Sequence, residues 1–151
     1  MPQSPLCGAG MLRVVFDTVI FVRALLNPKS RCGRLLFQYS DRYEIIVSQA
    51  TARELLEVIE RPAITAKYKS VAALDRQRMI DLLAQAETVE LTTIPAVVRD
   101  PKDDIFVATA IAGHADYLVS EDKDLLALGD LGGVRVVDAQ AFIALFEPSA
   151  M

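Results

Sequence analysis

The chain has 151 residues, of which 52% are hydrophobic and 24% are charged, a composition that suits one compact domain rather than a disordered chain. Its 16 basic and 20 acidic residues give a net charge of −4, which excludes a protein held on nucleic acid by its overall charge. Every apolar run is much shorter than the roughly 20 residues that a membrane span requires, so we expect no membrane segment.

The N-terminal residues and the cysteines bear on where the protein works. Residues 1–10 (MPQSPLCGAG) have neither the basic nor the apolar part of a signal peptide, and we expect a flexible tail followed by a single domain over residues 11–147. Cys7 and Cys32 lack metal-ligand spacing, and a disulfide between them has no support, which favours a reducing, cytoplasmic setting. The single histidine, His114, excludes any mechanism that needs two imidazoles.

Short apolar runs alternate with helical patterns along the chain. The predicted strands are rich in apolar and β-branched side chains, and they cover residues 12–16, 44–47, 88–91, 117–119 and 134–137. The predicted helices cover residues 18–26, 33–39, 49–60, 64–68, 71–86, 103–112, 122–128 and 139–146. This alternation predicts an α/β fold, a three-layer α/β/α sandwich around a mainly parallel sheet of four to five strands.

Local signals mark where several of these helices begin and end. Ser48 and Asp138 are suited to cap the helices that follow them, and Gly113 suits a left-handed position after a helix. In the helix over residues 49–60, the apolar positions that we expect on one buried face are Ala52, Leu55, Leu56 and Ile59.

Acidic side chains recur just after predicted strands and at the starts of the helices that follow. We expect Asp17, Glu54, Asp104 and Asp122 at the same edge of the sheet, with Asp124 as a fifth candidate, because ligands bind where parallel strands end. Two carboxylates ~5 Å apart at an effective dielectric of ~20 repel by about 3 kcal/mol. Such a cluster needs protons or a hard divalent cation, Mg²⁺ or Mn²⁺, and its natural chemistry is phosphodiester hydrolysis assisted by one or two metal ions.

Each of these acids also has a simpler structural explanation. Asp104 or Asp122 alone could interact with a helix dipole, and Glu54 could be a surface charge on an amphipathic helix. Asp17 is harder to explain in this way, because it directly follows a buried VVF run. The other acids of this region are interpreted as solvated or capping charges: Asp100, Asp103, Asp116 and Glu121.

Basic side chains are scattered rather than clustered. Lys123 would screen the acids beside it, and His114 is interpreted as a cap or surface residue. Several other cations have two explanations: they border an RNA groove, or they only keep the protein soluble. These cations are Arg23, Lys29, Arg31, Arg34 and Arg53.

Four sequence blocks resemble those of a known family. VVFDTVIFVRALLNPKSRCGRLL, SQATARELLEVIERP and DPKDDIFVATAIAGHADYLVSEDKDLL follow one another, and VRVVDAQAFIALF fits a last strand and helix. In this order they resemble the PIN-domain family, in which the first strand ends in an Asp-Thr-Asn triplet. The similarity is greatest to the subgroup of toxins from toxin–antitoxin pairs, similar to VapC toxins.

The resemblance implies a Mg²⁺- or Mn²⁺-dependent endoribonuclease that cleaves single-stranded RNA. It also implies a homodimer that is inhibited by a cognate antitoxin protein. Carried over by motif, the residues that would ligate metal and position the attacking water are Asp17, Glu54, Asp104 and Asp122. Thr18 and Ser120 would support them by hydrogen bonding, and Asp124 would bind a second ion or support Asp122.

One position departs from the family pattern. Val19 stands where the triplet carries asparagine, and valine cannot supply the amide that supports the acidic site. The alternative hypothesis is therefore a catalytically weakened PIN-fold module that binds RNA or a protein partner without turnover. Phosphoryl transfer by an aspartate nucleophile, as in haloacid-dehalogenase-like enzymes, is less well supported, because that chemistry needs a second Asp at position 19. The chain also has no Gly-rich phosphate loop of the P-loop type.

Overall fold

The computed structural model describes residues 11–68, 73–91 and 101–147. The expected tail (residues 1–10) and the expected loop after the third strand (residues 92–99) lie outside the described residues. Among the described helices, none combines the length and the apolar character that a membrane crossing needs.

A six-stranded sheet forms the centre of the molecule, with the strand order β3-β2-β1-β4-β6-β5. All neighbouring strands run parallel except the pair β5 and β6. The strands are β1 (Leu12–Phe16), β2 (Tyr43–Ser48), β3 (Glu87–Val89), β4 (Tyr117–Val119), β5 (Asp130–Leu131) and β6 (Val134–Val137). The expected α/β/α class with a mainly parallel sheet is confirmed.

The sheet has one strand more than the sequence predicts. The two-residue strand β5 turns back onto β6 through Gly132 and Gly133, whose φ angles of 59° and 102° suit glycine. The turn is closed by the backbone N–H of Gly133, which donates to Oδ1 of Asp130 at 3.1 Å. A strand of two residues is too short to show the alternation of apolar and polar side chains by which a strand is recognised in a sequence.

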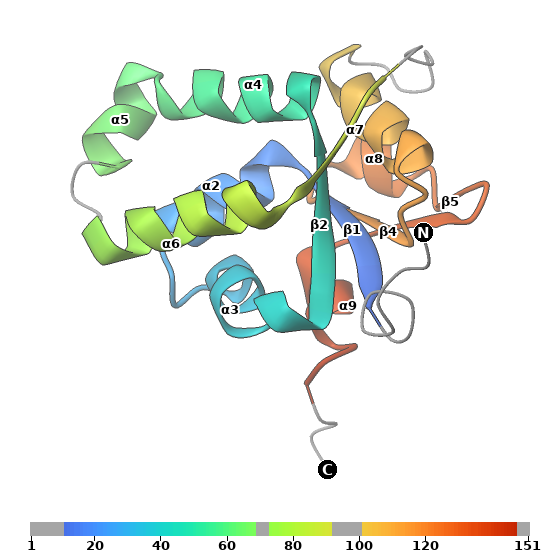
Figure 1. Cartoon of the computed structure of the whole chain (residues 1–151), viewed down its shortest axis with the longest axis horizontal. Coiled ribbons are helices and arrows are strands. Elements are labelled where there is room, and N and C mark those ends of the chain that lie inside the picture. Colours follow the sequence, from blue (N-terminus) through green and yellow to red (C-terminus); the bar gives the residue numbers. More distant parts are fainter. Residues whose placement is uncertain (1–10, 69–72, 92–100, 148–151) are drawn as a thin grey trace.

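Helices cover both faces of the sheet (Figure 1). One face carries the core cluster built from α2, α3, α4, α6 and α9, and the other carries the cluster built from α7 and α8. The helices are α2 (Thr18–Leu26), α3 (Arg31–Gln38), α4 (Gln49–Ile59), α5 (Pro62–Tyr68), α6 (Ala73–Gln85), α7 (Pro101–Ala112), α8 (Lys123–Leu126) and α9 (Ala139–Ile143), with a 3₁₀ turn, η1 (Ser40–Arg42), between α3 and β2.

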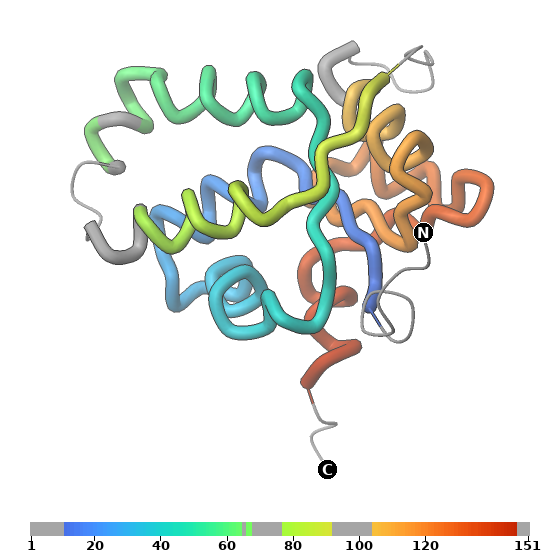
Figure 2. The backbone as a smooth tube through the Cα atoms, in the orientation of Figure 1, coloured from blue at the N-terminus to red at the C-terminus, as the bar shows by residue number. Residues whose placement is uncertain are grey.

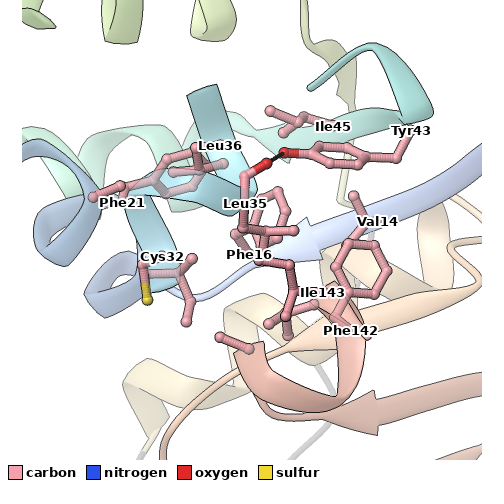
Figure 3. Packing of buried hydrophobic residues seen from close by; sticks show 14 of the residues in the cluster. Val14, Phe16, Phe21, Cys32, Leu35, Leu36, Tyr43, Ile45, Phe142 and Ile143 are labelled. Carbon is pink, nitrogen blue, oxygen red and sulfur yellow. Dashed lines mark hydrogen bonds between the residues drawn. The ribbon is translucent and has the colours of Figure 1, made fainter. Parts of the chain in front are cut away.

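Aromatic rings fill the first of these two clusters (Figure 3). Phe16 at the end of β1 meets Phe21, Tyr43 and Phe142 edge to face, at centroid distances of 5.7, 5.4 and 6.0 Å. The hydroxyl of Tyr43 donates to the carbonyl of Leu35 at 2.7 Å, so the one polar atom of this ring is satisfied. Burial raises the pKa of Tyr43. The residue directly before Asp17 is therefore held by rigid packing.

Side-chain caps begin the helices at the expected places. The hydroxyl of Ser48 accepts from the backbone N–H of Thr51 in a capping box, and Asp138 accepts from Ala141 at the start of α9. Leu56, which was expected on the buried face of α4, is 58% exposed. Leu55 and Leu56 lie about 100° apart around a helix, and the packing of α4 buries the side that carries Leu55.

The end of α7 also differs from the expectation. Gly113 is not left-handed, and the residue with positive φ is His114, at 52°. Gly113 is needed for a different reason, because a Cβ there would lie 2.7 Å from Cγ2 of Ile46. The glycine permits close packing of α7 on β2.

The path of the chain shows which helices lie together beyond the sheet. In Figure 2, α2, the α4–α5 pair and α6 extend to the same side of the central strands. Contacts join α2 to α4, α5 and α6. The segment between β2 and β3 thus returns over α2, the helix that follows Asp17.

Candidate active site

The carboxyl ends of β1 and β4 are neighbours at the point where the strand order changes direction. The chain runs from β1 outward to β2 and β3, and it then returns to place β4 on the other side of β1. In open parallel sheets this switch point is where ligands bind. The backbone N–H of Asp17 donates to the carbonyl of Val119 at 2.9 Å, which joins the two strand ends directly.

Asp17 is buried, and contacts from α2 and from Ser120 hold its carboxylate. It is 6% exposed and caps α2, where its Oδ1 accepts from the backbone N–H of Val19 at 3.4 Å. Its Oδ2 accepts from the Ser120 hydroxyl at 2.8 Å, and the same hydroxyl accepts from the backbone N–H of Asp122 at 3.0 Å. Ser120 therefore links the carboxylate after β1 to the loop after β4.

A cleft of about 510 Å³ opens beside these groups. We call it the acidic cleft. Its walls combine carboxylates, two arginines and apolar side chains of α2, α4, α5 and α7. They are formed by Asp17, Thr18, Val19, Val22, Arg23, Glu54, Val58, Arg61, Ile64, Phe106, Glu121 and Asp122.

The electrostatics of the cleft act on Asp17. Burial raises the pKa of this carboxyl, and the hydrogen bonds from Ser120 and Val19 oppose the rise. The nearby charges of Asp122 and Glu54 raise it further. Three carboxylates are therefore close enough to repel one another, which is a cost to the protein unless a proton or a cation offsets it.

The expected acids do not all reach this cleft. Asp17, Glu54 and Asp122 line it. Asp122 is also the N-cap of α8, where its Oδ1 accepts from the backbone N–H of Asp124 at 2.8 Å, so the capping interpretation is confirmed and its role in a site stays a prediction. Asp104 is buried on α7 but is not among the lining residues, and Asp124 is exposed outside the cleft.

The carboxylates are near one another without forming a finished metal site. Within residues 11–68, 73–91 and 101–147, no group of three or more His, Cys, Asp or Glu side chains is arranged to hold an ion. Thr18 supplies a further observation, because its hydroxyl oxygen is buried without a hydrogen-bond partner while its residue lines the cleft. Buried hydroxyls are nearly always satisfied, and a water or ligand in the cleft is the partner expected for this one.

Two charged residues of the cleft, Glu121 and Arg61, were not predicted as site residues. Glu121, interpreted from sequence as a solvated or capping charge, lines the cleft and also caps α9, where its Oε2 accepts from the backbone N–H of Ala139 at 2.9 Å. Its Oε1 contacts Nη1 of Arg23 at 3.4 Å. Arg61 lies just beyond the end of α4, the helix that carries Glu54, and it also lines the cleft.

The other expected groove cations lie elsewhere. Arg34 pairs with Glu147, and Arg53 lines a separate cavity beside β2 and β3. Lys29 and Arg31 are not among the residues that line the acidic cleft. Of the five cations considered from the sequence, Arg23 is the one that the structure places there.

Comparison with known protein sequences gives a family and a relative. A family model described as PIN domain matches residues 13–124, which is about three quarters of the chain. The uncharacterized protein MJ1680 of Methanocaldococcus jannaschii is 27% identical over 123 residues, which cover 79% of this chain and 76% of that protein.

Comparison with solved structures gives the same fold. The crystal structure of PAE2754 from Pyrobaculum aerophilum matches with a TM-score of 0.55 and 16% identity, over 95% of this chain and 97% of that one. VapBC2 from Rickettsia felis, bound to a DNA fragment from its promoter, matches with a TM-score of 0.55 and 14% identity, over 84% and 98% of the two chains. DNA-bound VapBC from Salmonella typhimurium matches with a TM-score of 0.51 and 17% identity, over 85% and 99%. Identities of this size establish a shared fold and nothing further.

Proposed function

The chain belongs to the PIN-domain family, and on that premise we propose that the acidic cleft is the active site of a divalent-metal-dependent endoribonuclease that cleaves single-stranded RNA. The observation that carries the proposal is the meeting of Asp17, Glu54 and Asp122 around one cleft at the switch point of the sheet. A cluster of carboxylates with a raised pKa at its most buried member is typical of a site that binds cations.

Mg²⁺ or Mn²⁺ fits the donors that the cleft provides. These ions prefer hard oxygen ligands, and Asp17, Glu54 and Asp122 supply carboxylates beside the unsatisfied hydroxyl of Thr18. Asp104 would complete the set from α7, and Asp124 would bind a second ion or support Asp122. When bound, such an ion lowers the pKa of a coordinated water and offsets charge on a phosphodiester.

The chain's own contribution is to fix its carboxylates before any substrate arrives. Ser120 holds Oδ2 of Asp17 and the backbone of Val19 holds Oδ1, so this carboxylate is preorganised and needs little rearrangement. Its burial keeps bulk water away and strengthens every charge interaction made there. Asp17 would thereby orient the attacking water, with Thr18 supplying a further hydrogen bond.

We further propose that the protein is the toxin of a toxin–antitoxin pair. The likeness to the VapBC structures from two bacteria and the sequence resemblance to VapC toxins support this assignment. A cognate antitoxin protein would inhibit the enzyme, which would act as a homodimer in the cytoplasm.

The test is cleavage of an end-labelled, unstructured single-stranded RNA during a titration with Mg²⁺ or Mn²⁺. We expect cleavage by the wild type to rise with metal and to stop in EDTA. Asp17→Asn and Asp104→Asn should each lower the rate about a hundredfold or more, because each removes stabilisation of several kcal/mol from the transition state. Both variants should also abolish growth arrest on expression.

Asp138→Asn is the matched control for this assay, since Asp138 caps α9 outside the lining of the cleft. Unchanged cleavage by Asp17→Asn would contradict the proposal. Unchanged cleavage by Asp104→Asn alone would remove Asp104 from the site and leave the other acids in place.

A second candidate function rests on Val19. Its side chain lines the acidic cleft and is 41% exposed, so it occupies site surface without offering a hydrogen bond. This position favours a weakened module that binds RNA or a protein partner without turnover. In that case the wild type should bind without cleaving, and Val19→Asn should switch cleavage on; slow cleavage by the wild type that Val19→Asn leaves unchanged would exclude it.

A further inference from the structure

We propose that Arg23 and Arg61 bind phosphate groups of the RNA strand in the acidic cleft, and that Glu121 keeps Arg23 in position there. The inference rests on the proposed function, because it names the groups that let an acidic site accept a polyanion. Arg23 is a residue of α2, and Arg61 lies between α4 and α5. The two guanidinium groups would therefore reach the substrate from different elements.

The charge balance of the cleft calls for such groups. Four carboxylates line it, from Asp17, Glu54, Glu121 and Asp122, and the lining includes two cationic side chains. A chain with a net charge of −4 gains little long-range attraction for RNA. Local arginines beside the carboxylates are then the protein groups that can offset repulsion between the site and the phosphates.

Arg23 is held loosely enough to exchange partners. Its side chain is 55% exposed, and its ion pair with Glu121 is one contact of 3.4 Å. The other oxygen of Glu121 is fixed by the backbone N–H of Ala139, so Glu121 can steer Arg23 without moving itself. A guanidinium has five N–H donors, and this contact uses one nitrogen, which leaves donors for a phosphate.

Arg61 is exposed at the rim of the cleft. It lies just beyond the end of α4, the helix that carries Glu54 and Val58, and its backbone N–H donates to the carbonyl of Val58 at 3.2 Å. In the part of the chain that the structure describes, its side chain has no ion pair. Holding an arginine at this place gives the fold no visible stabilisation.

Arg13 shows what a structural arginine looks like in the same protein. Its guanidinium group contacts Glu44, Glu87 and the carbonyl of Gly113 at 2.7–3.1 Å, and its side chain is 27% exposed. A single exposed ion pair such as the one between Arg23 and Glu121 contributes little stability. Substrate binding therefore accounts for the placement of Arg23 and Arg61 better than folding does.

The experiment measures binding of a fluorescent single-stranded RNA by anisotropy, in EDTA so that no cleavage occurs, over a series of salt concentrations. We expect Arg23→Ala and Arg61→Ala each to weaken binding about three- to tenfold. Each should also reduce the slope of log Kd against log salt by about 0.7, the value for one phosphate contact on a single strand. A merely structural arginine would lower Tm and leave this slope unchanged.

Arg42→Ala is the charge-matched control. Arg42 is exposed in η1, just before the amino end of β2, whereas the cleft lies at the carboxyl ends of the strands. This variant should leave both the Kd and the slope as in the wild type. Glu121→Gln keeps an acceptor for Ala139 and removes the charge that holds Arg23, so Arg23→Ala should weaken binding less in the Glu121→Gln background than in the wild type.

Wild-type slopes in Arg23→Ala and Arg61→Ala would overturn the inference, as would a wild type that binds no RNA. Binding and cleavage are separate readouts here. RNA binding through these arginines without cleavage at any metal concentration would contradict the nuclease and leave the phosphate contacts standing. Metal-dependent cleavage together with unchanged RNA binding by Arg23→Ala and Arg61→Ala would support the nuclease and contradict the phosphate contacts.

Discussion

At the scale of single residues, Asp17 combines a structural and a chemical task. Its carboxylate caps α2 and accepts from Ser120, yet burial and the charges of Asp122 and Glu54 raise its pKa. A residue chosen for stability alone would not be a charge in that place, since an asparagine can cap α2 without a charge. A residue that lowers the stability of the fold in this way is expected at a functional site.

Asp17→Asn should make the metal-free protein more stable at neutral pH. The raised pKa means that the folded protein binds this proton more tightly than the unfolded chain, so the contribution of Asp17 to stability falls as the pH rises from the ordinary pKa of the carboxyl through its raised folded value. The variant removes this loss, but its amide has one acceptor oxygen for the two hydrogen bonds that Val19 and Ser120 donate, so the gain is smaller than the raised pKa alone implies. Thermal unfolding over a pH series measures the gain, at about 2–4 °C in Tm for each kcal/mol.

The advantage of Asp17→Asn should vanish below the ordinary pKa of an aspartate, where the wild-type carboxyl is protonated in both states. Asp138→Asn, another helix N-cap, should change Tm little at any pH. If Asp17→Asn is less stable than the wild type at every pH, the prediction is wrong, because the charge of Asp17 is then compensated in the folded protein.

At the scale of elements, the site depends on how closely α7 packs on β2. Gly113 ends α7 against Ile46, and the hydroxyls of Thr109 and Ser48 lie 2.8 Å apart between the same two elements. β2 leads into α4, which carries Glu54, while α7 carries Phe106 into the cleft wall. The distance between α7 and β2 therefore sets the separation of two walls of the cleft.

Gly113→Ala should lower the free energy of unfolding by about 1–3 kcal/mol, because its Cβ would overpack against Ile46 and the carbonyl of Thr109. His114→Gly is the matched comparison. It relieves a φ of 52° and should be neutral or stabilising by up to about 1 kcal/mol. Urea unfolding distinguishes them, and equal stabilities for Gly113→Ala and the wild type would contradict the close approach.

At the scale of the whole molecule, Arg13 joins the edge of the sheet to its centre. It lies on β1 and donates to Glu44 on β2, to Glu87 on β3 and to the carbonyl of Gly113 after α7. The hydrogen bond from Arg13 lowers the pKa of Glu87, whereas burial and the neighbouring Glu87 raise that of Glu44. β3 has β2 as its one partner strand among the described residues, so this cluster supports an otherwise lightly held edge.

Arg13→Met should lower the free energy of unfolding by about 1–3 kcal/mol, since it removes hydrogen bonds to charged groups and keeps the apolar stem. Hydrogen exchange should rise more in β3 than in β1. The share that Glu87 contributes is present above the ordinary pKa of a glutamate and is lost as the pH falls through its lowered folded value. Arg135→Met, at an exposed position of β6, serves as the control. An equal loss of unfolding free energy in both variants would contradict the stabilising role of the Arg13 cluster.

The sequence was sufficient for the fold class and the order of the elements, because apolar runs and capping residues are local signals. The long-range details were not readable. Whether Leu55 or Leu56 faces inward depends on how α4 packs, and the reason for Gly113 lies in Ile46, which is far away in the chain. Glu121 was interpreted as a solvated or capping charge, and nothing local shows that its carboxylate reaches both Arg23 and Ala139.

The candidate site was predictable in part for the same reason. Asp17 and Asp122 follow parallel strands, so the rule for strand ends places them together, and Glu54 follows β2 by one helical turn and a half. The neighbours of Asp104 are set by the docking of α7, and the structure leaves it outside the lining of the cleft. Its membership of the site stays a prediction.

Calorimetric titration of the protein with Mn²⁺ tests most directly whether the acids of the cleft act together. We predict saturable binding by the wild type at neutral pH, a rise in Tm with Mn²⁺ that follows from linkage, and loss of both in Asp17→Asn and Glu54→Gln, with Asp138→Asn unaffected. Equal binding of Mn²⁺ by the wild type and Asp17→Asn, or none by the wild type, would contradict the metal site on which the proposed nuclease depends.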